Sequence, residues 1–147
     1  MPDAIIQNVV FPVGAADADK LRASWQAAQT RYASELDAHQ IDLGRALAQA
    51  LDQWAASYTT FNDLVSELTR QKALWTTIAP LTRAKIKNAA RALQMDSAAV
   101  ARDAAASLTA IQALGGPAQK DLSSLLTDIA RRAADHQQRA AVTARGR

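Results

Sequence analysis

The chain has 147 residues, the size of one domain, and such a chain can bury a hydrophobic core without metal or disulfide support. It contains no cysteine, which excludes disulfides and thiolate metal sites, and no apolar run approaches the roughly 20 residues that span a bilayer. The net charge of +3 is uneven, because residues 1–80 sum to −3 and residues 81–147 sum to +6. The basic part either folds against the acidic part or meets an anionic partner.

Alanine supplies much of the hydrophobic fraction, and only 5% of the residues are aromatic. Alanine is the best helix former and a small core residue, so this composition favours closely packed helices. We therefore predict an all-α fold, either an elongated helical hairpin or a helical bundle. It should contain one long amphipathic helix, kinked or straight, and an extended N-terminal arm.

The arm is predicted at residues 1–16, which hold the chain's strand-like, β-branched stretch. A lone strand in a helical chain has no ladder partner, so it should pack on its own bundle or pair with another chain. No basic segment precedes the stretch, so we expect no signal peptide; a cytoplasmic location is the default, and export without a signal peptide would give the same sequence pattern. Its apolar residues are Ile5, Ile6, Val9, Val10 and Phe11.

Residues 17–79 are predicted to form a long helical region, because apolar residues recur mostly every three or four positions. Unbroken, it would span about 95 Å, so we expect a kink or a turn within it. Gly44 is one weak point. The favoured weak point is residues 57–63, because this segment is rich in poor helix formers and because Thr60 with Asp63 resembles a capping box.

Shorter helices should follow within the same domain, which ends at residue 140. Pro80 ends the long region, and Asp96 or Ser97 caps a new helix. The Gly115-Gly116 pair ends that helix, and Pro117 fits the first turn of the last one. The expected segments are 17–79, 81–95, 97–114 and 117–140, followed by a basic tail at 141–147.

Side chains that could perform chemistry do not form a recognisable catalytic motif. Glu35, His39 and Asp42 are spaced to share one helical face and could bind a divalent cation, but a solvated polar face explains them better. Asp135 and His136 are neighbours that point about 100° apart on a helix. We therefore expect no metal, no cofactor and no enzymatic activity.

Residues 86–108 resemble the helix-turn-helix pattern of DNA-binding proteins, with Ala90 where the two helices would cross. Two departures stand out, because Gln94 replaces the usual turn glycine and Asp103 occupies a usually apolar position. In this alternative the protein uses residues 81–108 to bind DNA. The contact residues would be Arg83, Lys85, Lys87, Arg91, Ser97 and Arg102.

The leading hypothesis is a non-enzymatic helical interaction or structural subunit, which assembles with itself as a homo-oligomer or with a larger protein partner. Tryptophan is frequent at binding hot spots, and a helical stripe this long is hard to cover with the rest of the chain. A second alternative is an amphipathic coat on a lipid or storage-granule surface. In the leading hypothesis the contacts come from the arm and from Trp25, Trp54, Tyr58, Phe61 and Trp75.

Overall fold

The computed structural model describes residues 13–70 and 80–145, and in these ranges the protein is all-α, as predicted, with no strand. Two single turns of 3-10 helix, η1 and η2, lie in the connections between α-helices. In chain order the elements are α2 (Val13–Arg31), η1 (Ala33–Glu35), α3 (Ala38–Arg70), α4 (Pro80–Ala110), η2 (Ile111–Ala113) and α5 (Gly116–Arg145).

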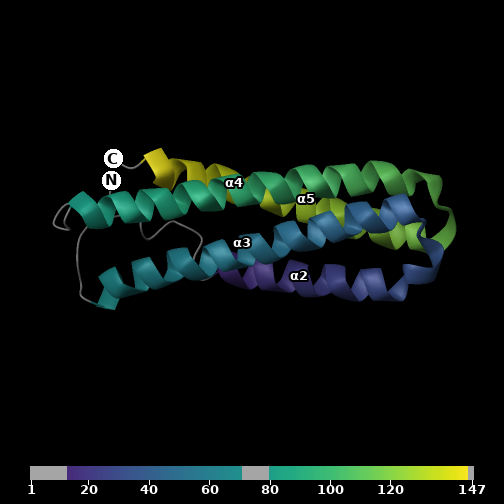
Figure 1. The fold of residues 1–147 in the computed structure, drawn as a ribbon, viewed down its shortest axis with the longest axis horizontal. Coiled ribbons are helices and arrows are strands. Elements are labelled where there is room, and N and C mark those ends of the chain that lie inside the picture. Colours follow the sequence, from purple (N-terminus) through teal and green to yellow (C-terminus); the bar gives the residue numbers. More distant parts are fainter. Residues whose placement is uncertain (1–12, 71–79, 146–147) are drawn as a thin grey trace.

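The helices form an elongated bundle in which each helix runs antiparallel to the one before it (Figure 1). The α2–α3 and α4–α5 connections lie at the same end of the bundle. The most extensive contacts join α4 to α5 and α3 to α4, whereas α2 packs mainly on α3 and touches α5 only sparsely. Because α2 has 19 residues and α3 has 33, α2 lines only part of the bundle's length.

The core is built from the apolar residues that recur along each helix. The aromatic stripe of the long region turns inward, since Trp25, Trp54, Tyr58 and Phe61 are each at most 3% exposed. The same spacing buries aliphatic residues on α3, α4 and α5. The largest fully buried ones are Leu47, Leu51, Ile86, Leu93, Val100, Leu122, Leu126 and Ile129. The folded chain therefore covers the aromatic stripe, which consists of Trp25, Trp54, Tyr58 and Phe61, with its own helices.

The long helical region is divided before α3 begins, and not at either of the two predicted weak points. Leu36 is extended, with φ of −96° and ψ of 139°. The Asp37 carboxylate accepts from the Gln40 backbone N–H at 2.8 Å, and the Gln40 side chain accepts from the Asp37 N–H at 2.9 Å. This reciprocal pair is a capping box, and it starts α3.

Residues 57–63 stay helical because tertiary contacts outweigh their poor propensity. Tyr58 and Phe61 are buried, and the Ser57 hydroxyl donates to the Asp96 carboxylate on α4. The Thr59 and Thr60 hydroxyls donate to backbone carbonyls four residues earlier, which satisfies them inside the helix. The prediction of a turn here is wrong.

Gly44 also lies inside α3, where its missing side chain allows α2 to approach closely. The Trp25 indole N–H donates to the Gly44 carbonyl at 2.9 Å. A Cβ at Gly44 would lie 3.3 Å from the Trp25 ring and 3.0 Å from the Gln29 side chain. The glycine therefore serves helix packing and does not break the helix.

The predicted turn at residues 95–97 is absent, because α4 continues from Pro80 to Ala110. Asp96 accepts the hydrogen bond from Ser57, and the buried Ser97 hydroxyl donates to the Leu93 carbonyl at 2.6 Å. Both candidate caps are thus engaged in other contacts. The helix-turn-helix interpretation is corrected accordingly, since its two helices are one.

The remaining boundaries agree in part with the sequence predictions. Pro80 begins α4, and Gly116, with φ of 68° in the left-handed region that favours glycine, precedes Pro117 at the start of α5. Helix α5 extends to Arg145, into the predicted basic tail, and α2 begins at Val13, inside the predicted arm. The apolar arm residues 5–11 and Trp75 lie outside the described residues.

Replacing Leu126 by alanine tests the core. This side chain is fully buried on α5, so we expect Leu126→Ala to lower the free energy of unfolding by about 2–5 kcal/mol. Urea denaturation followed by circular dichroism measures the change. Met95, which is 72% exposed, provides the control, and Met95→Ala should change stability by less than about 0.5 kcal/mol. Equal effects of the two changes would contradict this packing.

Candidate functional site: a buried polar network and a cationic helix face

A buried histidine joins three helices. His136 on α5 is 3% exposed, and its Nδ1 lies 2.5 Å from the Tyr58 hydroxyl on α3. Its Nε2 lies 3.1 Å from the Asp17 carboxylate on α2. An ionised carboxylate can only accept, so Nε2–H donates to Asp17, and in the neutral ring Nδ1 accepts from the Tyr58 hydroxyl. Both ring nitrogens are thereby satisfied.

Arginine and aromatic contacts extend this network. Arg132 donates to Asp17 at 3.1 Å and to Asp128 at 3.0 Å, and Asp128 also accepts from Arg131 at 2.9 Å. Burial alone would raise the pKa of the Asp128 carboxyl, but the hydrogen bonds from the two arginines hold that pKa below its ordinary value. The Trp54 ring meets the His136 ring edge-on, with centroids 5.3 Å apart.

The order carboxylate, imidazole, hydroxyl is the order of a nucleophilic triad, yet the environment opposes that chemistry. Tyr58 is 2% exposed, and burial together with the Asp17 charge raises the pKa of its hydroxyl well above the ordinary value. A raised pKa keeps the proton on the oxygen, so the hydroxyl is a poor nucleophile at neutral pH. The geometry suits a polar cross-link between α2, α3 and α5.

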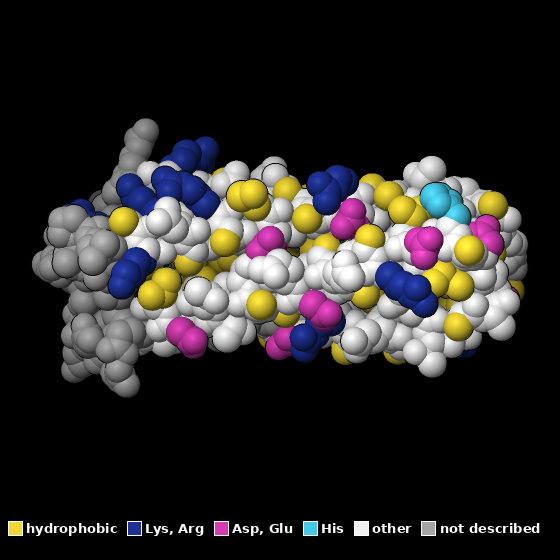
Figure 2. Space-filling model, in the orientation of Figure 1, with side chains coloured by type: hydrophobic (Ala, Val, Ile, Leu, Met, Phe, Trp, Pro, Cys, Tyr) yellow, Lys and Arg dark blue, Asp and Glu magenta, His cyan; other side chains and the backbone are white. Residues whose placement is uncertain are grey.

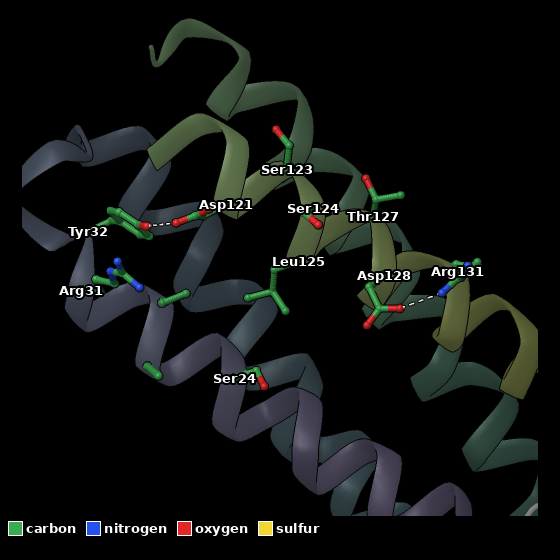
Figure 3. A pocket seen from close by; sticks show the side chains of 12 residues that line it. Ser24, Arg31, Tyr32, Asp121, Ser123, Ser124, Leu125, Thr127, Asp128 and Arg131 are labelled. Atoms are coloured by element: carbon green, nitrogen blue, oxygen red, sulfur yellow. Dashed lines mark hydrogen bonds and ion pairs between the residues drawn. The ribbon is translucent and has the colours of Figure 1, made fainter. Parts of the chain in front are cut away.

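An open groove of about 1140 Å³ runs between α2 and α5 (Figure 3). Near one end of the lining, the Tyr32 hydroxyl donates to Asp121; near the other, Arg131 pairs with Asp128. Leu125 points across it toward α2. Its walls also carry Ser24, Ala27, Ala28, Arg31, Ser123, Ser124 and Thr127. Asp17, Tyr58 and His136 do not line this groove, so it gives no access to the buried network.

The first turns of α4 form the second notable feature, a cationic face that we define as Arg83, Lys87 and Arg91, which follow one another at four-residue intervals. Lys85 lies on the same turns, but two residues correspond to about 200° around a helix, so it points away from this face. Figure 2 shows lysine and arginine side chains gathered over this part of α4. No aspartate or glutamate occurs in residues 80–95. Ion pairs elsewhere in the bundle engage basic side chains such as those of Arg22, Arg131 and Arg139, but within the described residues the cationic face forms none.

This arrangement is electrostatically unfavourable for the isolated bundle. The N-terminus of a helix carries a partial positive charge, which favours acidic residues, yet the first turn of α4 contains none. Arg83, Lys87 and Arg91 are spaced four residues apart, so neighbouring like charges repel. Each effect costs a few tenths of a kcal/mol. In the part of the chain that the structure describes, the polar contact of these side chains is the Arg91 hydrogen bond to Asn88 at 2.7 Å.

The structure brings together three of the six predicted DNA-contact residues, Arg83, Lys87 and Arg91, while Lys85 points about 160° away from Arg83 and Lys87. Ser97 is fully buried and cannot reach a partner, and Arg102, three turns beyond Arg91, lies 3.4 Å from Asp103. The predicted protein-contact residues Trp25, Trp54, Tyr58 and Phe61 lie in the chain's own core. The other predicted contacts, in the arm and at Trp75, lie outside the described residues.

The carboxylates and histidine considered for a metal do not share one helix. Glu35 belongs to η1, whereas His39 and Asp42 follow the break on α3. Among the described residues, no group of three or more potential ligands is arranged to hold a metal ion. In the same ranges no helix combines the length and apolar character needed to span a membrane.

Sequence reasoning missed the network around His136 because its partners are 78 and 119 residues away in the chain. One local signal was present, since His136 continues the apolar spacing of Ile129, Ala133 and Ala140 on α5. A histidine at a core position needs buried partners. Its neighbour Asp135 points elsewhere and pairs with Arg139 at 3.3 Å.

Comparison with known proteins finds no match to this chain among family models, curated proteins or solved structures.

The protonation of Tyr58 can be followed directly, because the chain has only two tyrosines and Tyr32→Phe leaves Tyr58 as the sole reporter. Its folded-state pKa is raised, so the stability from the neutral phenol is present below about pH 10 and is lost as pH rises above that value. We expect tyrosinate absorbance to appear only when helicity is lost. Ionisation near pH 10 with intact circular dichroism would refute the buried position.

Removing the Asp17 carboxylate tests the cross-link. Asp17→Ala leaves the buried His136 N–H without its acceptor, so we expect the free energy of unfolding to fall by about 1–3 kcal/mol. The matched control is Asp19→Ala on the same helix. Asp19 pairs only with Arg22 at the surface, and its removal should cost less than about 1 kcal/mol. Urea denaturation at pH 7 distinguishes the two; similar losses would mean that the network contributes no stability.

Proposed function

We propose that this chain is a non-enzymatic helical subunit that acts by binding a larger, anionic macromolecule on the outside of its bundle. The cationic face of α4 is the contact surface. This proposal keeps the interaction role expected from the sequence but moves the contact away from Trp25, Trp54, Tyr58 and Phe61, which pack inside the chain.

The observation that carries the proposal is a row of charges that forms no ion pair within the described residues. Arg83, Lys87 and Arg91 stand on one flank of α4 within nine residues at the positive end of the helix, without an acidic neighbour on α4 before Asp96. Proteins break local electrostatic rules mainly at functional sites, where a ligand supplies the missing compensation. An anionic partner would relieve the repulsion within the cationic face and interact favourably with the helix dipole.

The use of the buried polar groups supports the non-enzymatic part of the proposal. Asp17, Tyr58 and His136 satisfy one another and connect three helices, so their hydrogen-bonding capacity is spent on the fold. Packing of α4 against both α3 and α5 holds the cationic face on a straight, supported helix. A fixed array of charges loses little conformational freedom on binding, which favours affinity.

Assembly through the N-terminal arm, with another copy or with a partner protein, stays a prediction from the sequence. The lipid-coat alternative has less support, because the described residues expose only Met95 and Val142 as large hydrophobics. A coat protein needs a wide exposed apolar face to insert among lipids.

Binding to immobilised heparin, a generic polyanion, tests the proposal. We expect Arg83→Gln, Lys87→Gln and Arg91→Gln together to lower the salt concentration at which the protein elutes. The control is Arg22→Gln, Arg131→Gln and Arg139→Gln, which changes the net charge equally, from +3 to 0, but on other faces. It should elute close to the wild type. If both variants elute together, only net charge matters and the proposal is wrong.

A further inference from the structure

We infer that the partner of the cationic face is a nucleic acid duplex, contacted through its phosphates without reading of base sequence. The inference rests on the proposed function and narrows the anionic macromolecule to one class. Three observations favour this class: the linear spacing of the charges, the lack of a wide apolar patch among the described residues, and the lack of base-reading groups nearby.

The charges are arranged as a line and not as a pocket. Arg83, Lys87 and Arg91 follow one another at intervals of four residues, each step rising about 6 Å and turning about 40° around α4. Lys85, two residues from both Arg83 and Lys87, points about 160° away from them and does not belong to this line. A row of about 12 Å on a rigid helix is suited to successive phosphates of an extended polyanion, which arginine and lysine side chains contact individually.

The burial of the opposite side of α4 holds this row in place. Ile86 and Ala90 are fully buried and Leu93 nearly so, which fixes the rotation of the helix relative to α3 and α5. Lys85 and Arg91 are exposed, while Arg83 and Lys87 are partly so. The charged ends therefore reach solvent from a helix that cannot rotate without breaking core contacts.

The surroundings of the row fit a nucleic acid better than a protein or a lipid surface. Protein interfaces are centred on buried aromatic anchors and are poor in lysine, and lipid surfaces require an apolar face. Among the described residues, Met95 on α4 and Val142 on α5 are the exposed large hydrophobics. Interfaces with nucleic acids are instead polar and strongly positive, as this one is.

Sequence-specific reading is disfavoured by the same helix. A reader needs several side chains that reach base edges, usually from a helix placed in the major groove. The exposed positions between the basic residues are Ala84 and Asn88, Ala92 follows Arg91, and Ser97 is buried. Asn88 already accepts from Arg91. Binding should therefore depend on phosphate charge alone.

Counterion release gives this inference a numerical signature. If the three basic residues of the row neutralise phosphates, the slope of log K against log salt concentration should be about −2.7. Affinity should then fall roughly 40-fold between about 50 and 200 mM salt. Non-specific affinities of this kind have dissociation constants of roughly 10⁻⁴–10⁻⁶ M at physiological salt.

Fluorescence anisotropy of labelled DNA duplexes of about 20 base pairs, two helical turns, measures both quantities. We expect two duplexes of unrelated sequence to bind the full chain equally, with the slope above. Arg83→Gln, Lys87→Gln and Arg91→Gln together should remove all three contacts and bring the slope close to zero. The variant with Arg22, Arg131 and Arg139 changed to glutamine should keep the wild-type slope. Circular dichroism checks that both variants retain full helicity.

Parallel titrations with polyglutamate and with phosphatidylcholine–phosphatidylserine vesicles separate the alternatives. The nucleic acid inference is overturned if heparin binds through the cationic face but the duplex does not. It is also overturned if polyglutamate or the vesicles bind more tightly than the duplex through that face. In both cases the proposed function stands. If no polyanion binds through the face, both fail. A preference for one duplex sequence would overturn the phosphate-only mode of binding.

Discussion

Burial of the α3 face that carries Trp54, Tyr58 and Phe61 is the interaction on which the bundle depends. Burying a tryptophan ring removes about 150–250 Å² of surface from water, which is worth roughly 4–6 kcal/mol. Among the described residues, the Trp54 indole nitrogen has no hydrogen-bond partner. This costs about 1–3 kcal/mol, which the burial of the ring offsets. This burial keeps residues 57–63 helical and brings the Tyr58 hydroxyl to His136.

The polar network follows from that burial. A phenol placed in the core needs a hydrogen-bond partner, and His136 supplies it from the apolar side of α5. The imidazole in turn needs an acceptor, which Asp17 provides from the beginning of α2. Since α2 touches α5 only sparsely, this carboxylate and the Tyr32–Asp121 hydrogen bond are the main ties across that side of the bundle. Burial of the apolar face of α3 thus determines how α2 is attached to the bundle.

The charged side chains of the bundle have different roles on different helices. Acidic residues on α2 and α5 are engaged with arginines that brace the fold, including the Arg132 contacts to Asp17 and Asp128. Within the described residues, the basic residues of the cationic face form no ion pair, so the stability of the bundle and the charge of this face are separable properties. This separation allows a surface to be altered for binding while the core stays intact, which makes the proposed contact accessible to experiment.

The sequence by itself determined the elements whose signals are local. Alanine content and apolar spacing predicted an all-α fold, and Pro80, Gly116 and Pro117 marked helix ends, because proline and glycine restrict the backbone wherever they stand. The basic residues of the cationic face were also visible, since charge spacing on a helix can be read directly. The capping box of Asp37 and Gln40 is also a local sequence signal, and it fits the motif better than the pattern at Thr60 and Asp63 does.

Only the tertiary structure decided what depended on distant residues. Whether residues 57–63 bend, whether Ser97 caps a helix and whether the tryptophans face a partner all depend on which side chains arrive from other helices. Gly44 is the clearest case, because a residue that weakens an isolated helix becomes the contact point for Trp25 once α2 packs against α3. Local propensities differ by about 1 kcal/mol or less, whereas the burial of one large side chain contributes several, so packing overrides propensity wherever the two conflict.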